Sequence, residues 1–187
     1  MSIIYYSVGC TRPRNICTEL NNWISGGRLS HAECLQVIRD FPNVVQYVLS
    51  ESNGWQNIRG VKFVRIGEND IVNSRDVVRI WLSTANDIDN VYCTGLRGMK
   101  ENNLSCANLQ TKNVWLNLDR WMFGGDFGQN LADYRRYVVN HEVGHAAFGL
   151  RHPECDEIEG EIAPVMLQQT YNLCKRLKLN PYPMEYE

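Results

Sequence analysis

The sequence predicts an α+β domain that is built on a mixed, twisted β-sheet. Stretches with the alternating or β-branched pattern of strands lie at residues 3–8, 61–66, 77–83 and 113–118. Helical patterns lie from about residue 31 to the Asn53-Gly54 stop, with an interruption at Pro42, and at about residues 131–148. The order strand, helix, two strands, short edge segment, strand and long helix indicates this class of fold.

The first strand and the helix after it are predicted from local patterns. Residues 3–8 are apolar and β-branched or aromatic enough for a strand. Ser30 and Glu33 have the spacing of a capping box, which marks the start of a helix. Pro42 predicts an interruption, because proline lacks the N–H that a helix interior needs, and it suits the first turn of a second helix. The apolar stripe of that second helix consists of Val44, Val45, Val48 and Leu49.

The long C-terminal helix has start and stop signals. Asn130 is a favoured N-cap residue, and Asp133 places a negative charge in the first turn, where the helix dipole stabilises it. Gly149 is a natural residue to follow the last turn, so the helix is expected over Leu131–Phe148. Before it, the Gly- and Asn-rich segment at residues 93–106 predicts a loop with short edge structure.

Length and composition indicate one globular domain. The 187 residues suit a single domain over residues 1–187, of which residues 1–40 have no assignment beyond a strand and a helix start. Hydrophobic residues make up 44% and charged residues 21%, as in ordinary globular proteins. The net charge is −2 without a basic block, so no nucleic-acid partner is expected. No apolar run approaches the ~18 residues of a membrane span, and the first residues do not resemble a signal peptide.

The chain has seven cysteines, which is many for a cytosolic protein of this size. They form no C-x-x-C pair, which argues against a zinc ribbon or a thioredoxin-like redox site. Disulfides are therefore expected, with at least one thiol left over, and they favour an extracellular location. The alternative is that most cysteines are reduced and fill the core as small apolar residues. The cysteines are Cys10, Cys17, Cys34, Cys93, Cys106, Cys155 and Cys174.

The end of the long helix carries candidate metal ligands. His141 and His145 are four residues apart, so both imidazoles leave the same helix face and can reach one ion. Glu142 is rotated off that face, where it can approach a metal-bound water without binding the metal. Gly149 allows a sharp turn, after which His152 can return as a third ligand. Three protein ligands and an open fourth position are typical of catalytic zinc.

The same pattern has a structural alternative. A chance HExxH helix usually carries solvated histidines or histidines that are satisfied in the core. Here three of the four histidines fall between positions 141 and 152, next to a helix-ending glycine. This clustering favours a metal site. The fourth histidine, His31, is expected to be a surface residue at a helix start.

The helix and turn resemble the metzincin zinc peptidases, whose pattern is HExxHxxGxxH followed by a Met-turn. More narrowly, the chain is similar to a bacterial, metzincin-like family that is catalogued only as a domain of unknown function. The resemblance covers about residues 41–183 and is specific from residue 104 onward. The stretches that carry it are Leu104–Cys106, VWLNLDRW at 114–121, LADYRRYVVNHEVGH at 131–145, APVMLQQT at 163–170 and Asn180–Pro181.

This resemblance implies a zincin-like domain with a backing helix, an active-site helix and a Met-turn. It implies that Glu142 is the catalytic glutamate and that Met166 is the Met-turn methionine under the metal, although Met166 alone would suggest a flexible core filler. Because cysteines occur near matching places in that family, it also implies the disulfides Cys93–Cys106 and Cys155–Cys174. The implied ligands of one catalytic Zn²⁺ are His141, His145 and His152.

The chain departs from the metzincin spacing at one position. The family pattern puts the glycine three residues after the second histidine, whereas Gly149 lies four residues after His145. One extra α-helical residue rotates the chain beyond it by about 100° and moves it about 1.5 Å. A π-bulge or a looser helix end is needed to absorb this change. The reserve candidates for the third ligand are Glu154, Asp156 and Glu157.

The expected function is that of a zinc metalloendopeptidase, a hydrolase acting on a peptide or protein substrate. A zinc-activated water would be deprotonated by Glu142, which then protonates the leaving amine. The substrate is expected along the edge segment at residues 103–107, with Tyr134 or Tyr171 near the oxyanion. The alternatives are an inactive, zinc-stabilised binding module and a zinc hydrolase of non-peptide amides such as cell-wall cross-links. A structural site needs no base, so Glu142 argues against the binding module.

Overall fold

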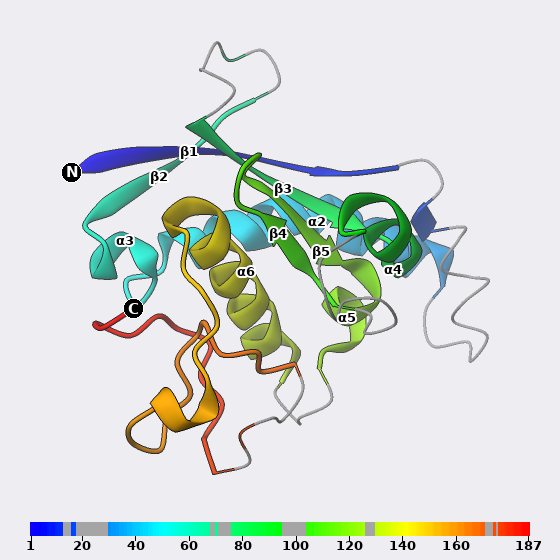
Figure 1. Ribbon diagram of the computed structural model, residues 1–187. Helices are drawn as coiled ribbons and strands as arrows, with labels where there is room; N and C mark the ends of the chain where they lie inside the picture. Colours follow the sequence, from blue (N-terminus) through cyan, green and yellow to red (C-terminus); the bar gives the residue numbers. More distant parts are fainter. Residues whose placement is uncertain are drawn as a thin grey trace.

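The computed structural model describes residues 1–12, 16–17, 30–67, 70, 76–94, 104–125, 130–170, 174 and 176–187. A β-sheet forms one layer, and the long helices α2 (His31–Ser50) and α6 (Leu131–Phe148) pack on one of its faces (Figure 1). The chain after α6, yellow to red in Figure 1, lies below the sheet and against that helix. The predicted α+β class with a mixed sheet is confirmed.

The described sheet has five strands in the order β2-β1-β3-β5-β4. The first four in this order run parallel to their neighbours, and β4 is antiparallel to β5. Helix α2 connects the parallel pair β1 and β2. The short edge structure that was expected near residue 106 is β4. The strands are β1 (Ser2–Cys10), β2 (Val61–Arg65), β3 (Val77–Ser83), β4 (Cys106–Asn108) and β5 (Asn113–Asn117).

Alternate residues of the central strands form the main core. Ile80 of β3 pairs with Val8 of β1 and with Val114 of β5, and all three side chains face the helices. They pack against α2 and α6, where Phe41 and Val139 are fully buried. A smaller cluster lies apart from this core and contains the buried residues Ile88, Cys93, Cys106 and Trp115.

Helix α2 is continuous, so the predicted interruption at Pro42 is wrong. The helix starts with a complete capping box, in which Ser30 and Glu33 each accept the other's backbone N–H. A proline in a helix interior costs about 3 kcal/mol. Burial of one large apolar side chain contributes roughly 1.5–3 kcal/mol. The burial of several such side chains of α2 therefore offsets the cost of the proline. The buried residues of α2 are Cys34, Phe41, Val45, Val48 and Leu49.

The short helical elements were not predicted. The clearest difference is at Leu118, which was assigned to a strand but begins a helix. The reason is Asn117, whose side-chain oxygen accepts the N–H groups of Asp119 and Arg120 and so caps that helix. The short elements are α3 (Trp55–Ile58), α4 (Ala85–Asp87), the π-helical turn η2 (Ile88–Tyr92), α5 (Leu118–Phe123) and the 3-10 turn η3 (Cys155–Glu157).

Six of the cysteines form disulfides. Cys93–Cys106 and Cys155–Cys174, which the family resemblance implied, are confirmed, and Cys17–Cys34 was not predicted. Cys10 is the remaining thiol, and burial raises its pKa to about 11. Three disulfides are compatible with an extracellular protein. Among the described residues, no helix combines the length and the apolar character that crossing a membrane requires.

Candidate metal centre

Helix α6 supplies two of the three clustered histidines. Its start is fixed as predicted, because the side chain of Asn130 accepts the N–H of Asp133 at 2.9 Å. From there the helix runs to Phe148, the predicted end. His141 and the neighbouring Glu142 are buried, with only 2% and 4% of their surfaces exposed, whereas His145 is half-buried. The helix therefore places one imidazole in the interior and the next one closer to solvent.

The Nε2 atoms of His141, His145 and His152 form a small triangle. Nε2 of His141 lies 3.3 Å from that of His145 and 3.0 Å from that of His152. The third side, between His145 and His152, is also 3.0 Å. Two Zn–N bonds of about 2.0–2.1 Å at a tetrahedral angle separate their nitrogens by about 3.3 Å. In the described part of the chain, no other group of three His, Cys, Asp or Glu side chains converges in this way.

Hydrogen bonds at the other ring nitrogens orient two of these imidazoles. Nδ1 of His141 lies 2.8 Å from the carbonyl oxygen of Val165, and Nδ1 of His145 lies 2.6 Å from that of Leu150. A carbonyl oxygen only accepts, so each Nδ1 carries the proton and each neutral ring turns an Nε2 lone pair into the triangle. Lone pairs cannot hydrogen-bond one another, but a shared cation satisfies them. The arrangement therefore fits a metal ion.

Burial keeps these imidazoles in the neutral form that binds metals. Burial, together with His145 and His152, lowers the pKa of His141 well below its usual value. Burial also lowers the pKa of His145, and with His145 as neighbour it lowers the pKa of His152 to about 4. Burial raises the pKa of the Glu142 carboxyl to about 8. That carboxyl can therefore take both protonation states near neutral pH.

A wide turn at the end of α6 returns the chain to the triangle. Gly149 has a φ of 68°, in the left-handed region that favours glycine. Its N–H reaches the carbonyls of both His145 and Gly144, and the N–H of Leu150 also reaches Gly144, at 3.3 Å. Bonds to carbonyls five and six residues back widen the last turn beyond the α-helical spacing of four. The extra residue before Gly149 is thus accommodated at the helix end, and α6 contains no π-bulge.

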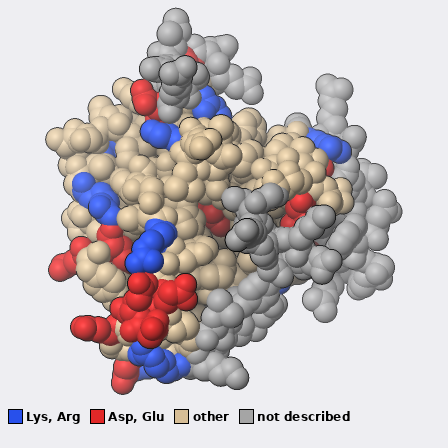
Figure 2. Space-filling view, in the orientation of Figure 1, with Lys and Arg blue, Asp and Glu red and all other residues tan. Residues whose placement is uncertain are grey.

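The reserve ligands lie away from the triangle. Glu154, Asp156 and Glu157 are exposed, and none of them belongs to the converging group. The Glu157 carboxylate instead pairs with Arg151 at 2.9 Å and accepts the N–H of Glu154 at 2.8 Å. Acidic side chains gather at the lower left of Figure 2, where Figure 1 draws η3. The third corner of the triangle is therefore His152 and no carboxylate.

Met166 packs against α6 between the two helical histidines. A Cβ at Gly144 would meet the Met166 sulfur and would lie 3.0 Å from Cζ2 of Trp55, so both side chains rest on this glycine. Trp55 also donates from Nε1 to the carbonyl of Asn140 at 2.8 Å. That carbonyl belongs to the residue before His141. Met166 and Trp55 thus pack against the buried side of α6 at Gly144.

Tyr137 ties the chain around Met166 to the helix. It lies one turn before His141, and the centroids of the two rings are 5.2 Å apart. Its hydroxyl oxygen accepts the N–H of Gln169 at 2.8 Å, and its proton is within reach of the Gln168 side-chain oxygen at 3.2 Å. The loop that provides the Val165 carbonyl is therefore fixed relative to His141.

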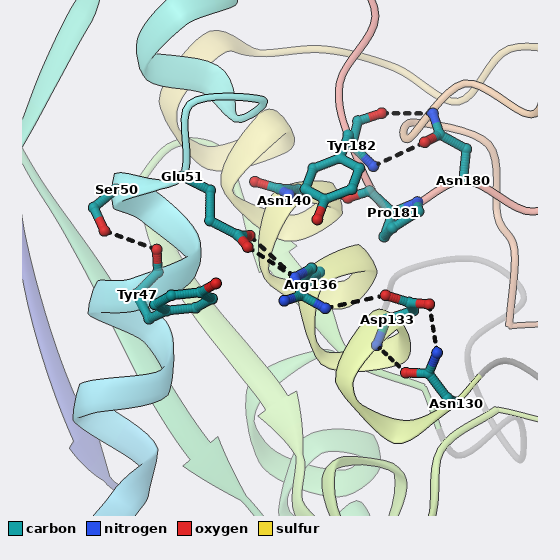
Figure 3. Close-up of polar contacts among 10 residues, drawn as sticks. All are labelled: Tyr47, Ser50, Glu51, Asn130, Asp133, Arg136, Asn140, Asn180, Pro181 and Tyr182. Carbon is teal, nitrogen blue, oxygen red and sulfur yellow. Dashed lines mark hydrogen bonds and ion pairs between the residues drawn. The ribbon is translucent and has the colours of Figure 1, made fainter.

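A polar network holds the part of α6 that precedes His141 (Figure 3). Arg136 pairs through Nε with Glu51, the C-cap residue of α2, at 2.9 Å and through a terminal nitrogen with Asp133 at 3.1 Å. The Asn140 side chain donates to the carbonyl of Pro181 at 2.9 Å. Neighbouring segments thus contact this helix through side chains as well as through the core.

The structure brings together the three histidines that the sequence indicated, while their binding of zinc and the role of Glu142 remain predictions. His31 is exposed at the start of α2, as expected. Tyr134, which was considered for the oxyanion, is 1% exposed, and Tyr171 lies outside the described residues. Sequence reasoning missed the groups that hold the ligands. Of these, Tyr137 and Leu150 lie within five residues of a histidine in the sequence, whereas Trp55 and Val165 are distant from the histidines.

Comparison with known proteins places the chain in a family. Searches of the curated proteins and of the solved structures find no match to it. A family model described as "Protein of unknown function (DUF3152)" matches residues 38–182, which include α6 and all three histidines. Since the match spans most of the 187 residues, the chain belongs to this family of unknown function.

Proposed function

We propose that this protein is a zinc-dependent metallopeptidase of the metzincin type. The observation that carries the proposal is the triangle of Nε2 atoms from His141, His145 and His152, with sides of 3.0–3.3 Å. Structural zinc sites are usually closed by four protein ligands, whereas catalytic sites have three and leave one position for water or substrate. A three-histidine set therefore supports hydrolytic chemistry over a structural role.

Glu142 supports the same reaction class. Zinc in such a site lowers the pKa of a water from 15.7 towards ~7 and polarises the scissile carbonyl. Glu142 would take a proton from the water and deliver it to the leaving amine. Glu142 lies next to His141 in the sequence, and burial raises the pKa of its carboxyl above the usual value, which favours uptake of a proton.

Strand β4 supports a peptide as substrate. It pairs with β5 on one side and is an edge of the described sheet. It also lies against α6, the helix that carries His141 and His145. An extended peptide can add to a sheet edge through backbone hydrogen bonds, with its side chains pointing alternately to the two faces. In this proposal β4 holds the substrate backbone beside the metal.

Met166 supports the metzincin type in particular. It packs under Gly144, between the two helical ligands, and the preceding Val165 supplies the carbonyl that orients His141. In the family that the sequence resembles, the Met-turn methionine lies under the metal. In this proposal the segment around Met166 is therefore the Met-turn.

The test is cleavage of a proteome-derived peptide library by the zinc-loaded protein. We expect cuts that stop on chelation and return with added zinc. Glu142→Gln should keep zinc and fold but lose about 10²–10⁴-fold in rate, the usual contribution of a general base. The matched control is Glu154→Gln, an exposed carboxylate nearby that should change little.

The outcomes separate the alternatives. Cleavage by Glu142→Gln at the parental rate would refute the proposed role of the glutamate. A parent that binds zinc but cuts no peptide would indicate a binding module. Release of fragments from muropeptides, without cuts in the peptide library, would indicate an amide hydrolase that acts on cell-wall cross-links.

A further inference from the structure

The last ten residues lie across the segment that carries Met166. Lys178 donates its N–H to the carbonyl of Glu161 at 2.7 Å, and its own carbonyl accepts the N–H of Ala163 at 2.8 Å. Further along, the side chain of Gln169 bonds both the N–H and the carbonyl of Asn180. These contacts bring the end of the described chain back towards α6.

Within this segment, the side-chain carboxylate of Glu187 accepts three backbone N–H groups. Its Oε1 accepts the N–H of Met166 at 2.8 Å, and its Oε2 accepts those of Val165 at 3.0 Å and Met184 at 2.8 Å. Hydrogen bonds to a carboxylate are roughly twice as strong as those between neutral groups. Burial raises the pKa of Glu187, and the three N–H donors act against that effect. The carboxylate thus holds two consecutive amides of the Met166 segment.

Val165 links this carboxylate to the metal centre. Its N–H is held by Glu187, and its carbonyl accepts the Nδ1 proton of His141 at 2.8 Å. Any rotation of the backbone at Val165 would therefore move the acceptor that orients this imidazole. Groups that hold ligands in this way typically change metal affinity 10–100-fold when they are removed.

Tyr137 holds the later part of this segment at Gln169, whereas Glu187 holds the amides of Val165 and Met166. Glu187 lines a cavity of about 520 Å³ together with Met166 and Leu150. Leu150 is the residue whose carbonyl orients His145. Because there is space on this side, the Met166 segment could shift into it if the carboxylate were absent.

We infer that Glu187 is a positioning residue of the metal centre, which holds His141 in its binding orientation through the Val165 and Met166 amides. The inference rests on the proposed zinc site and adds to it a residue that lies outside the matched region 38–182. Glu187 touches neither metal nor substrate in this role; it acts through one peptide unit.

The test compares zinc affinity and Co²⁺ absorption spectra of the full-length parent and its variants. Glu187→Ala should weaken zinc binding about 10–100-fold and alter the cobalt spectrum. Glu187→Gln keeps one acceptor oxygen and should fall between the parent and Glu187→Ala. The matched control is Glu185→Ala, which removes an exposed carboxylate from the same segment and should leave both readouts unchanged.

Melting of each metal-free variant distinguishes positioning from general stability. If Glu187→Ala melts lower without metal yet binds zinc with parental affinity and gives the parental spectrum, the inference is wrong. The same holds if Glu187→Gln, which preserves shape and folds more readily, equals the parent while Glu187→Ala cannot be obtained. A parent that binds no zinc would overturn the proposed site itself, and the inference with it.

Discussion

The candidate metal centre joins two regions that are held together by different means. In the sheet region, residues 1–148, strand ladders and a large apolar core fix the chain. In the C-terminal region, residues 149–187, the described chain has one 3-10 turn, one isolated bridge and a small apolar cluster. There, bonds from side chains to backbone replace regular structure; Arg176, for example, donates to three carbonyls. Single side chains should therefore matter more for order in the C-terminal region.

Removal of the Cys155–Cys174 disulfide should give the largest effect. The bridge closes a loop with a separation of 19 residues, so the double serine variant should lose about 3 kcal/mol in the entropic estimate. We expect faster amide exchange, measured by mass spectrometry, over residues 149–187 and unchanged exchange in β3 and β5. The control is removal of the Cys17–Cys34 disulfide, which lies in the sheet region and has a similar separation of 17 residues. Equal loosening of both regions would contradict the comparison.

Gly144→Ala tests the contact between the regions. The new Cβ would meet the Met166 sulfur and would lie 3.0 Å from Cζ2 of Trp55, so one or both of these side chains would have to move. We expect a loss of about 2 kcal/mol in urea denaturation, since overpacking typically costs 1–3 kcal/mol. A gain would mean that helix propensity, about 1 kcal/mol in favour of alanine, outweighs the clash. Ala147→Ser, on the half-buried side of the same helix, is the control.

Arg136→Gln tests an ion pair between residues of the sheet region. The Arg136–Glu51 pair is mostly shielded, with 21% and 13% of the side-chain surfaces exposed. Its loss should cost roughly 1–2 kcal/mol, less than for a fully buried pair because solvent still screens it. The control, Lys178→Gln, breaks a pair whose side chains are 76% exposed and should be nearly neutral. Equal losses in thermal melts would contradict this ranking.

Ser30→Ala should have the smallest effect. It removes the capping box of α2, which should cost roughly 0.5–1 kcal/mol, the lower range for an exposed N-cap. Zinc affinity should stay unchanged, because Ser30 lies at the exposed start of α2, at the opposite end from the Glu51 contact to α6. Ser50→Ala, at the other end of the helix, is the matched control. A shift in zinc affinity would show that the two regions are more tightly coupled than their contacts suggest.

What the sequence predicted well is what neighbouring residues determine. The limits of α6 follow from Asn130, Asp133 and Gly149, each of which acts on backbone groups within a few positions. The spacing of His141 and His145 fixes their common helix face in the same local way. The two correctly predicted disulfides came from family resemblance instead, since spacing alone does not determine connectivity.

What the sequence did not show depends on distant contacts. Pro42, for example, stays inside α2 because the core behind it stabilises the helix. Leu118 is an exception: it leaves its strand because its neighbour Asn117 caps a new helix, a local signal that the alternating pattern of the strand outweighed in the prediction. Trp55 meets Asn140 across 85 positions, and Glu187 meets Val165 across 22. No pattern of period 2 or 3.6 encodes such pairs, so the groups that orient the ligands were not predicted.

The division of the three imidazoles between helix α6 and the chain beyond Gly149 has a thermodynamic consequence for the proposed site. An ion bound by all three would form a reversible cross-link between the two regions, since its ligand set is complete only when the regions are docked. At a free concentration 100 times the Kd, it would add about 2.7 kcal/mol to the docked form. The supply of metal would then determine how readily proteases cleave the C-terminal region. The ion would protect the protein from proteolysis in addition to its proposed role in the reaction.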